Sequence, residues 1–242
     1  MPEPLEPYRR AVEASGPGFD ALLWRNKAYQ EIRFKVLLEV AATGLAGPTE
    51  LGTILRLEGR TVIDIGCGVA DLAGWIRSIG LEVGGYIGVE GVPELAAASR
   101  ARMPGLGFQR DAVIEADFAQ DDALFDRLAA SSPGCVFVFS GSLNTFEVAG
   151  ATGVIERAHR AVLRSVDANG SGRADRSGGV VFNFLSAGLG APENSDTGPA
   201  HRFDALEMLR HFADAGTRSI FRRDYLGAHD ATIGLFPLLP DA

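Results

Sequence analysis

The chain has 242 residues, 46% of them hydrophobic and 22% charged, and its 23 Lys and Arg stand against 31 Asp and Glu for a net charge of −8. These are values of an ordinary globular protein and argue against bulk disorder. The negative charge opposes general binding to nucleic acid or to anionic membranes. No apolar stretch is long enough to span a bilayer, and the proline-broken N-terminus resembles no signal peptide, so we expect a cytoplasmic protein.

The N-terminal quarter is expected to be helical. From Ala21 the stretch ALLWRNKAYQEIRFKVLLEVAATG repeats apolar residues at helical spacing, and Gly44 is a plausible stop. Four aromatic residues of this quarter could line an acceptor pocket, although packing between helices is the better explanation for most of them: Tyr8, Phe19, Trp24 and Tyr29. We therefore divide the chain into a helical extension, residues 1–59, and one α/β domain, residues 60–242.

Strands and helices alternate after Arg60. The expected strands are TVIDIG, GGYIGVE, AVIEADF, CVFVFSG and GVVFNFLS, each followed by a helix or a long loop. Near-continuous apolar strands separated by helices predict a parallel sheet covered on both faces. Two further extended runs, within RSIFRRDYLGAHDATIGLFPL, are joined by a short turn with no helix between them and predict a closing β-hairpin. The Gly- and Ser-rich stretch from Asp167 to Gly179 is expected to be a surface loop.

A glycine loop with acidic neighbours follows the first strand, in TVIDIGCGVADL. Gly66 and Gly68 allow a sharp turn at the edge of the sheet where α/β folds bind ligands. The dinucleotide pattern GxGxxG would need glycine where the chain has Asp71, and no Lys-Ser/Thr follows to make a phosphate-binding P-loop. A ligand with positive charge and no phosphate suits such a loop, and S-adenosylmethionine, with its sulfonium and ammonium groups, is one.

Glu90 supports this interpretation. It ends the second strand, YIGVE, 22 residues beyond Gly68, close to the spacing of an acid that holds ribose hydroxyls. A carboxylate there can accept charge-assisted hydrogen bonds from both hydroxyls.

In these features the chain resembles the class I S-adenosylmethionine-dependent methyltransferases, over roughly Thr61 to Leu238. VIDIGCGVADL resembles their first motif, with Ala70 where a third glycine is usual, and YIGVEG resembles the second. The resemblance implies a Rossmann-like seven-stranded sheet with a reversed last strand, helices on both faces and an N-terminal helical lid. It also implies S-adenosylmethionine as cofactor, held by residues that include Asp64, Gly66, Cys67, Gly68, Asp71, Glu90 and Gly91.

The resemblance extends to the later motifs. EADF resembles the third motif, in which Asp117 would bind the adenine amino group and Phe118 would lie against the ring. FQRDAV also resembles that strand, which would make Asp111 the adenine ligand. We prefer Asp117, because AVIEADF alternates better and an aromatic residue follows. The loop SGSLNTF after the fourth strand offers Ser140, with Ser142 and Asn144, as contacts to cofactor or acceptor.

Two further site residues are assigned. In some relatives an arginine of the lid meets the methionine carboxylate, and Arg33 is the candidate here. Among the four histidines, His201 lies in the long loop after GVVFNFLS and is our candidate for a general base. Methyl transfer from a sulfonium needs a base only when the acceptor must lose a proton. No acid cluster indicates a metal-dependent enzyme.

The sequence thus predicts a methyltransferase that acts on O, N or C of a small molecule. SGSLNTF stands where relatives that modify adenine or glutamine carry Asn/Asp-Pro-Pro-Tyr/Phe, which agrees with the negative charge in disfavouring nucleic acid as acceptor. The alternative is a non-catalytic protein of the same fold that binds or regulates. An NAD-type reductase is disfavoured by Asp71 and by the hairpin.

Overall fold

The computed structural model of the chain describes residues 3–46, 57–168, 178–187, 198–213 and 216–238. Most of the expected surface loop between Asp167 and Gly179 lies outside these residues. The helices are α1 (Glu6–Ser15), α2 (Lys27–Ala46), α3 (Asp71–Ser78), α4 (Pro93–Arg102), α5 (Leu124–Ser131), α6 (Val148–Ala168) and α7 (Ala205–His211). Short 3₁₀ helices are η1 (Phe19–Leu22), η2 (Met103–Leu106), η3 (Arg110–Ala112) and η5 (Leu226–Ala228).

One sheet organises the chain. Its strands are β1 (Leu57–Ile65), β2 (Val83–Glu90), β3 (Val113–Glu115), β4 (Val136–Phe139), β5 (Gly179–Ala187), β6 (Arg202–Asp204), β7 (Thr217–Arg222) and β8 (Asp230–Pro237). They run in the order β3-β2-β1-β4-β5-β8-β7, and β6 pairs with the end of β5. β8 is antiparallel to both neighbours while the strands from β3 to β5 are parallel. The predicted reversed last strand and closing hairpin are therefore confirmed.

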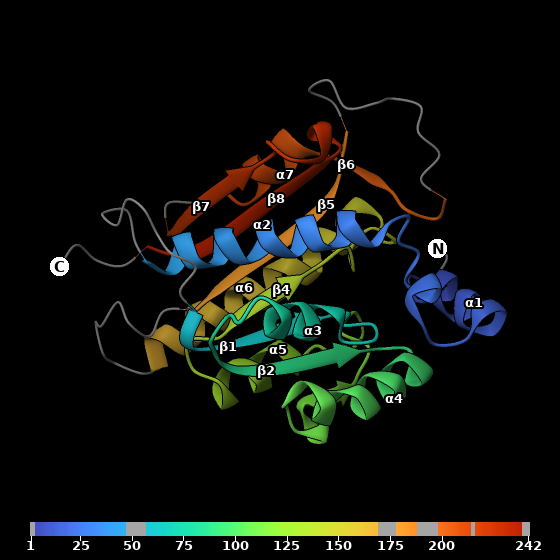
Figure 1. Cartoon of the computed structure of the whole chain (residues 1–242). Helices are drawn as coiled ribbons and strands as arrows, with labels where there is room; N and C mark the ends of the chain where they lie inside the picture. The colour runs from blue at the N-terminus through green and yellow to red at the C-terminus, as the bar shows by residue number, and fades with distance from the viewer. Residues whose placement is uncertain (1–2, 47–56, 169–177, 188–197, 214–215, 239–242) are drawn as a thin grey trace.

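Helices cover both faces of the sheet, as predicted. On one face α2 and α3 bury an apolar cluster that includes Leu37, Leu38 and Ile76 against Val62 and Val181. On the other face α5, α6 and α7 bury a cluster rich in phenylalanine. Figure 1 shows α2 lying across the β5–β8–β7 part of the sheet, with α6 on the opposite side. Among the described residues, no helix is both long and apolar enough to cross a membrane.

The expected strands differ from the observed ones in three places. β1 begins at Leu57, inside the segment assigned to the extension, because a register shift between Leu57 and Thr61 lets the polar start of the strand pair with β2. β3 is only three residues long, since the chain turns away at Asp117. The short strand β6 was not predicted; it ends at Asp204, whose side chain caps α7 by accepting from the backbone amides of Leu206 and Glu207.

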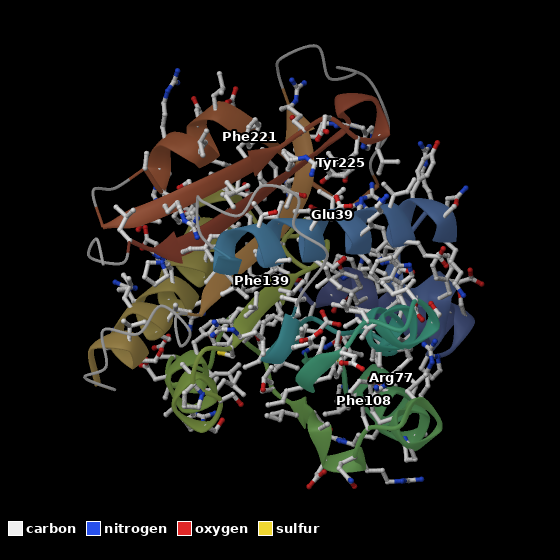
Figure 2. All side chains as sticks on the ribbon, turned by 60° about the vertical axis from the view of Figure 1, so that its left-hand side comes forward. Glu39, Arg77, Phe108, Phe139, Phe221 and Tyr225 are labelled. Carbon is white, nitrogen blue, oxygen red and sulfur yellow. The ribbon has the colours of Figure 1, made fainter. Side chains whose placement is uncertain are left out.

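The N-terminal extension consists of two parts with different surroundings. α1 and η1 contact one another and lie beyond the carboxyl end of β2, apart from α2 (Figure 1). α2 instead packs along β5, β8 and β7, and Figure 2 shows its side chains filling the space above the sheet. Glu39, labelled there, pairs with Arg222 of β7 at 3.5 Å. The expected lid thus corresponds to the segment before Lys27, while α2 is a layer of the fold.

A buried ion pair joins α2 to the hairpin. Nε and Nη2 of Arg33 donate to the two carboxylate oxygens of Asp230, at 2.6 and 2.8 Å, and the two side chains are 7% and 2% exposed. Burial alone would raise the pKa of Asp230, but the hydrogen bond from His229 and the Arg33 guanidinium outweigh it and hold that pKa below its usual value. The pair fixes where α2 sits on the sheet.

Candidate cofactor site

A cavity of about 90 Å³ opens at the carboxyl ends of β1, β2 and β4. Ligands of parallel α/β sheets bind at this edge. The floor is formed by the glycine loop and the strand ends, and the roof by five residues that come before α2: Leu5, Tyr8, Leu22, Leu23 and Trp24. Of the four aromatic residues named from the sequence, Tyr8 and Trp24 line this cavity, whereas Tyr29 is 49% exposed on α2.

Every second residue from Gly66 to Ala70 in the glycine loop has a positive φ. Gly66, Gly68 and Ala70 have φ of +75°, +56° and +60°. The amides of Gly66 and Cys67 both donate to the carbonyl of Val89, which ties the loop to the end of β2. A Cβ at Gly66 would lie 2.5 Å from Cβ of Ser142, so glycine is needed there for packing as well as for φ. Ala70, in place of the third glycine, adopts the left-handed conformation that glycine would adopt without strain.

Glu90 is buried at the end of β2 and lines the cavity. Its Oε2 accepts from the amide of Gly68 and its Oε1 from the amide of Val92, both at 2.8 Å. With 5% of the residue exposed, burial raises the pKa of Glu90, although the backbone donors oppose the shift. Each oxygen keeps a second acceptor site, so the carboxylate can still accept bonds from a ligand.

Two more carboxylates line the same cavity. Asp64 accepts a 2.7 Å hydrogen bond from the Tyr86 hydroxyl, and its burial raises its pKa to about 7. Asp71 pairs with Arg102 at 2.6 Å and is also within 3.4 Å of the amide nitrogen of Gln30. Among the described residues that line the cavity, none is Lys, Arg or His. The cavity therefore favours a ligand that carries positive charge.

Four buried oxygen atoms around the cavity have no hydrogen-bond partner within the described residues: Oε1 of Gln30, Oγ of Ser140, Oγ of Ser142 and Oγ1 of Thr145. Buried polar atoms in folded proteins almost always have partners, so these atoms are available to bind a polar ligand or water in the cavity. The sequence indicated Ser140 and Ser142 through their place after β4. It gave no signal for Gln30 or Thr145, because their role depends on how α2 and the loop after β4 face one another.

The third-motif residues lie beside the cavity. Phe118 lines it, and its ring stacks on Phe146 with centroids 5.8 Å apart. Asp117 is half-buried next to it and accepts from the amide of Ala119 at 2.9 Å, but it does not line the cavity itself. The rival candidate, Asp111, is exposed in η3 before β3 begins. The position of Asp117 after the strand fits the adenine assignment better.

Besides Asp117, three predicted site residues are not among the lining residues. Gly91 lies under the roof, where a Cβ would be 2.8 Å from Cδ1 of Leu5. Arg33 uses Nε and Nη2 to bind Asp230, and its guanidinium lies 4.7 Å from the ring centre of Trp24. His201 follows the lining residues Pro199 and Ala200, but its side chain is 43% exposed and lies 3.9 Å from Glu147.

Comparisons with known proteins bear on the fold. No family model and no curated protein matches the sequence. Among solved structures, the O-methyltransferase of neocarzinostatin biosynthesis, bound to S-adenosylmethionine and 2-hydroxy-5-methyl naphthoic acid, is 16% identical with a TM-score of 0.54, over 95% of this chain and 61% of that one. The N,N-8-amino-8-demethyl-D-riboflavin dimethyltransferase from Streptomyces davawensis is 17% identical with a TM-score of 0.54, over 97% and 61%.

A third structure acts on a different kind of acceptor. The small RNA methyltransferase HEN1 is 12% identical with a TM-score of 0.51, over 89% of this chain and 25% of that one. At these identities the likeness is one of fold. The strand order, the reversed β8 and these structures agree, and the chain has the fold of the class I S-adenosylmethionine-dependent methyltransferases.

Proposed function

We propose that the protein is an S-adenosylmethionine-dependent methyltransferase that methylates a small molecule. The observation that supports this most is the cavity itself, which combines three carboxylates with four unpartnered oxygens and has no cation among its described lining residues. Hydroxyls, an ammonium and a sulfonium match that set, whereas a dinucleotide pyrophosphate would meet Asp71.

The residues present fit this cofactor. Glu90 has free acceptor sites for ribose hydroxyls, and Asp117 with Phe118 would hold the adenine. Asp64 and Asp71 would complement the positive charge of the methionine part. The unpartnered hydroxyls of Ser140, Ser142 and Thr145 would complete the polar contacts. Arg33 is left out of this set, because its guanidinium is already bound by Asp230.

The bound cofactor supplies a methyl group already activated by its sulfonium. What the chain must do is align the acceptor and exclude water, and alignment alone can lower the barrier substantially. The apolar roof from Leu5 to Trp24 is placed to do both. An acceptor that must lose a proton would need a base, and His201, next to the lining residue Ala200, is the candidate.

A small-molecule acceptor is favoured over RNA. The net charge of −8 opposes binding to a phosphate backbone. Of the two structures with the higher TM-scores, one is bound to a naphthoic acid and the other is named as a dimethyltransferase of a riboflavin derivative, whereas HEN1, named as a small RNA methyltransferase, is matched over only 25% of its chain. Whether the acceptor atom is O, N or C is left to a substrate screen.

The test is calorimetry with S-adenosylhomocysteine and, in parallel, NADH. We expect binding of the first only. Glu90→Gln should weaken it by about 1.5–3 kcal/mol, because a charged acceptor for two hydroxyls is lost. Glu94→Gln, an exposed acid in the first turn of α4, is the matched control and should change nothing. Binding of NADH alone would refute the proposal. Cofactor binding without turnover on a broad acceptor panel would instead favour a non-catalytic binding protein.

A further inference from the structure

Arg157 of α6 donates hydrogen bonds to the backbone of the loop that follows β3. Its Nη2 donates to the carbonyl oxygens of Phe118 and Ala119, at 2.7 and 3.0 Å. Its Nη1 donates to the carbonyl of Asp121 at 3.3 Å and to the Asp122 carboxylate at 2.9 Å. One planar guanidinium thus bridges three backbone carbonyls of a single short loop, a geometry that lysine cannot reproduce.

β3 has ended at Glu115, so the residues of the loop lie outside the strand. Within it, Asp117 accepts from the amides of Ala119, Gln120 and Asp121 through its side chain or its carbonyl. The Phe118 ring lies between Phe146, at 5.8 Å, and Phe139 of β4, at 6.2 Å and nearly perpendicular. Figure 2 labels Phe139 in the middle of the molecule. The aromatic contacts orient the ring, and Arg157 fixes the backbone that carries it.

The Arg157 side chain is mostly shielded from solvent. Its side chain is only 18% exposed, and its guanidinium lies 5.6 Å from the ring centre of Phe125 on α5. Its one acidic partner, Asp122, is 92% exposed and so contributes little to an ion pair. The backbone carbonyls are therefore the main partners of this partly buried cation.

We propose that Arg157 is a positioning residue for the adenine end of the cofactor: it holds the 117–122 loop so that Asp117 and Phe118 meet the base. This inference rests on the proposed function. It predicts that Arg157 acts on affinity and on discrimination at the adenine amino group without touching the ligand itself.

The experiment compares Arg157→Met with Arg164→Met. Arg164 lies two turns further along the same helix, and it pairs at 2.6 Å with Asp126 while its side chain is 58% exposed, so the control removes an equal charge without affecting the loop. Affinities for S-adenosylhomocysteine and for S-inosylhomocysteine, which lacks the amino group, are measured by calorimetry. Hydrogen exchange of residues 117–122 is measured on the free proteins.

We expect Arg157→Met to bind S-adenosylhomocysteine at least about tenfold more weakly, to lose most of its preference over the inosyl analogue, and to exchange faster in the loop. Arg164→Met should match the wild type. Equal weakening for both ligands would assign Arg157 to stability alone and overturn the proposal, as would unchanged affinity. Wild-type protein that binds neither ligand would instead refute the proposed function.

A second variant covers the case in which Arg157→Met does not fold. Arg157→Lys keeps the charge and the apolar stem but can reach fewer carbonyls at once. We expect it to fold, with an intermediate loss of affinity and of discrimination. Full retention of both would show that the charge alone is needed, and would overturn the role assigned to the guanidinium.

Discussion

The floor and the roof of the cavity are built in different ways. The floor is anchored in the sheet, where the loop amides bond to Val89 and Glu90 and the strands bury two large apolar clusters. The roof, residues 5–24, is attached by a small cluster in which Leu5, Val12 and Ala21 meet Val69, Val92 and Leu95. A few apolar contacts give a low free energy of local opening. We therefore expect the roof to open locally at a lower free energy than the floor.

The largest expected effect tests where the roof ends and the fold begins. If α2 belongs to the fold, Arg33→Met should lower the free energy of unfolding by about 3–5 kcal/mol, because it leaves the buried Asp230 carboxylate without its partner. Lys35→Met, which removes an exposed pair with Glu39 on the same helix, should cost only about 0.5 kcal/mol. Urea unfolding measures both. A cost for Arg33→Met no larger than the control's would place α2 with the roof.

The second prediction concerns the roof directly. Amide hydrogens within α1 should exchange about a hundredfold faster than those of β4 and β5, since opening α1 exposes only the small cluster around Leu5 and Val12. S-adenosylhomocysteine should slow exchange in α1, as the roof lines the cavity. The α2 amides serve as the internal control and should exchange as slowly as the sheet. Equal protection of α1 and β4 in the free protein would remove the distinction between floor and roof.

The third prediction concerns how the ionisation of Asp64, in the floor of the cavity, makes cofactor affinity depend on pH. The pKa of Asp64 is raised to about 7 by burial, so the carboxyl is protonated in the free protein below that pH. A cationic ligand favours the ionised form, and binding then releases a proton. Affinity for S-adenosylmethionine should fall by about tenfold for each pH unit below 7. Asp64→Asn should flatten most of this dependence. Calorimetry in two buffers of different ionisation enthalpy counts the protons; no proton release at pH 6 would contradict the assignment.

The raised pKa of Asp64 also makes the stability of the free protein depend on pH. Because the pKa of Asp64 is raised above its unfolded value, its contribution to stability is fully present below about pH 4 and is lost as pH rises toward 7. The affinity for S-adenosylmethionine has the opposite pH dependence and is higher at higher pH. The free protein and the complex should therefore differ in the pH at which each is most stable.

The floor could be predicted from the sequence and the roof only in part. Asp64 and Glu90 lie at the ends of two apolar strands, and Gly66 and Gly68 directly follow the first, so a local pattern places all four at one edge. Arg33 shows the limit. A helical pattern identifies a buried face but not its partner, and Asp230 lies 197 residues away in the sequence. The carbonyls bound by Arg157 carry no sequence signal, because every residue has one.

The smallest effect concerns the one departure from the family pattern in the floor. Ala70 has φ +60° and ψ +41°, a conformation that costs a residue with a Cβ about 1–2 kcal/mol, and it is fully buried. Ala70→Gly relieves that strain, but it loses about 0.8 kcal/mol from a buried methyl and about 0.5–1 kcal/mol to the entropy of the unfolded chain. These terms nearly cancel, so we expect a change in unfolding free energy below about 1 kcal/mol.

Ala73 provides the matched control for that substitution. It is equally buried, two residues inside α3, where the backbone is helical and glycine relieves nothing. Ala73→Gly should therefore carry both losses and destabilise the fold by about 1.3–1.8 kcal/mol. Urea unfolding of the two variants gives the difference, which isolates the strain at Ala70. Equal destabilisation would mean that the loop relaxes around Ala70 without strain, and that the missing third glycine leaves the floor's conformational energy unchanged.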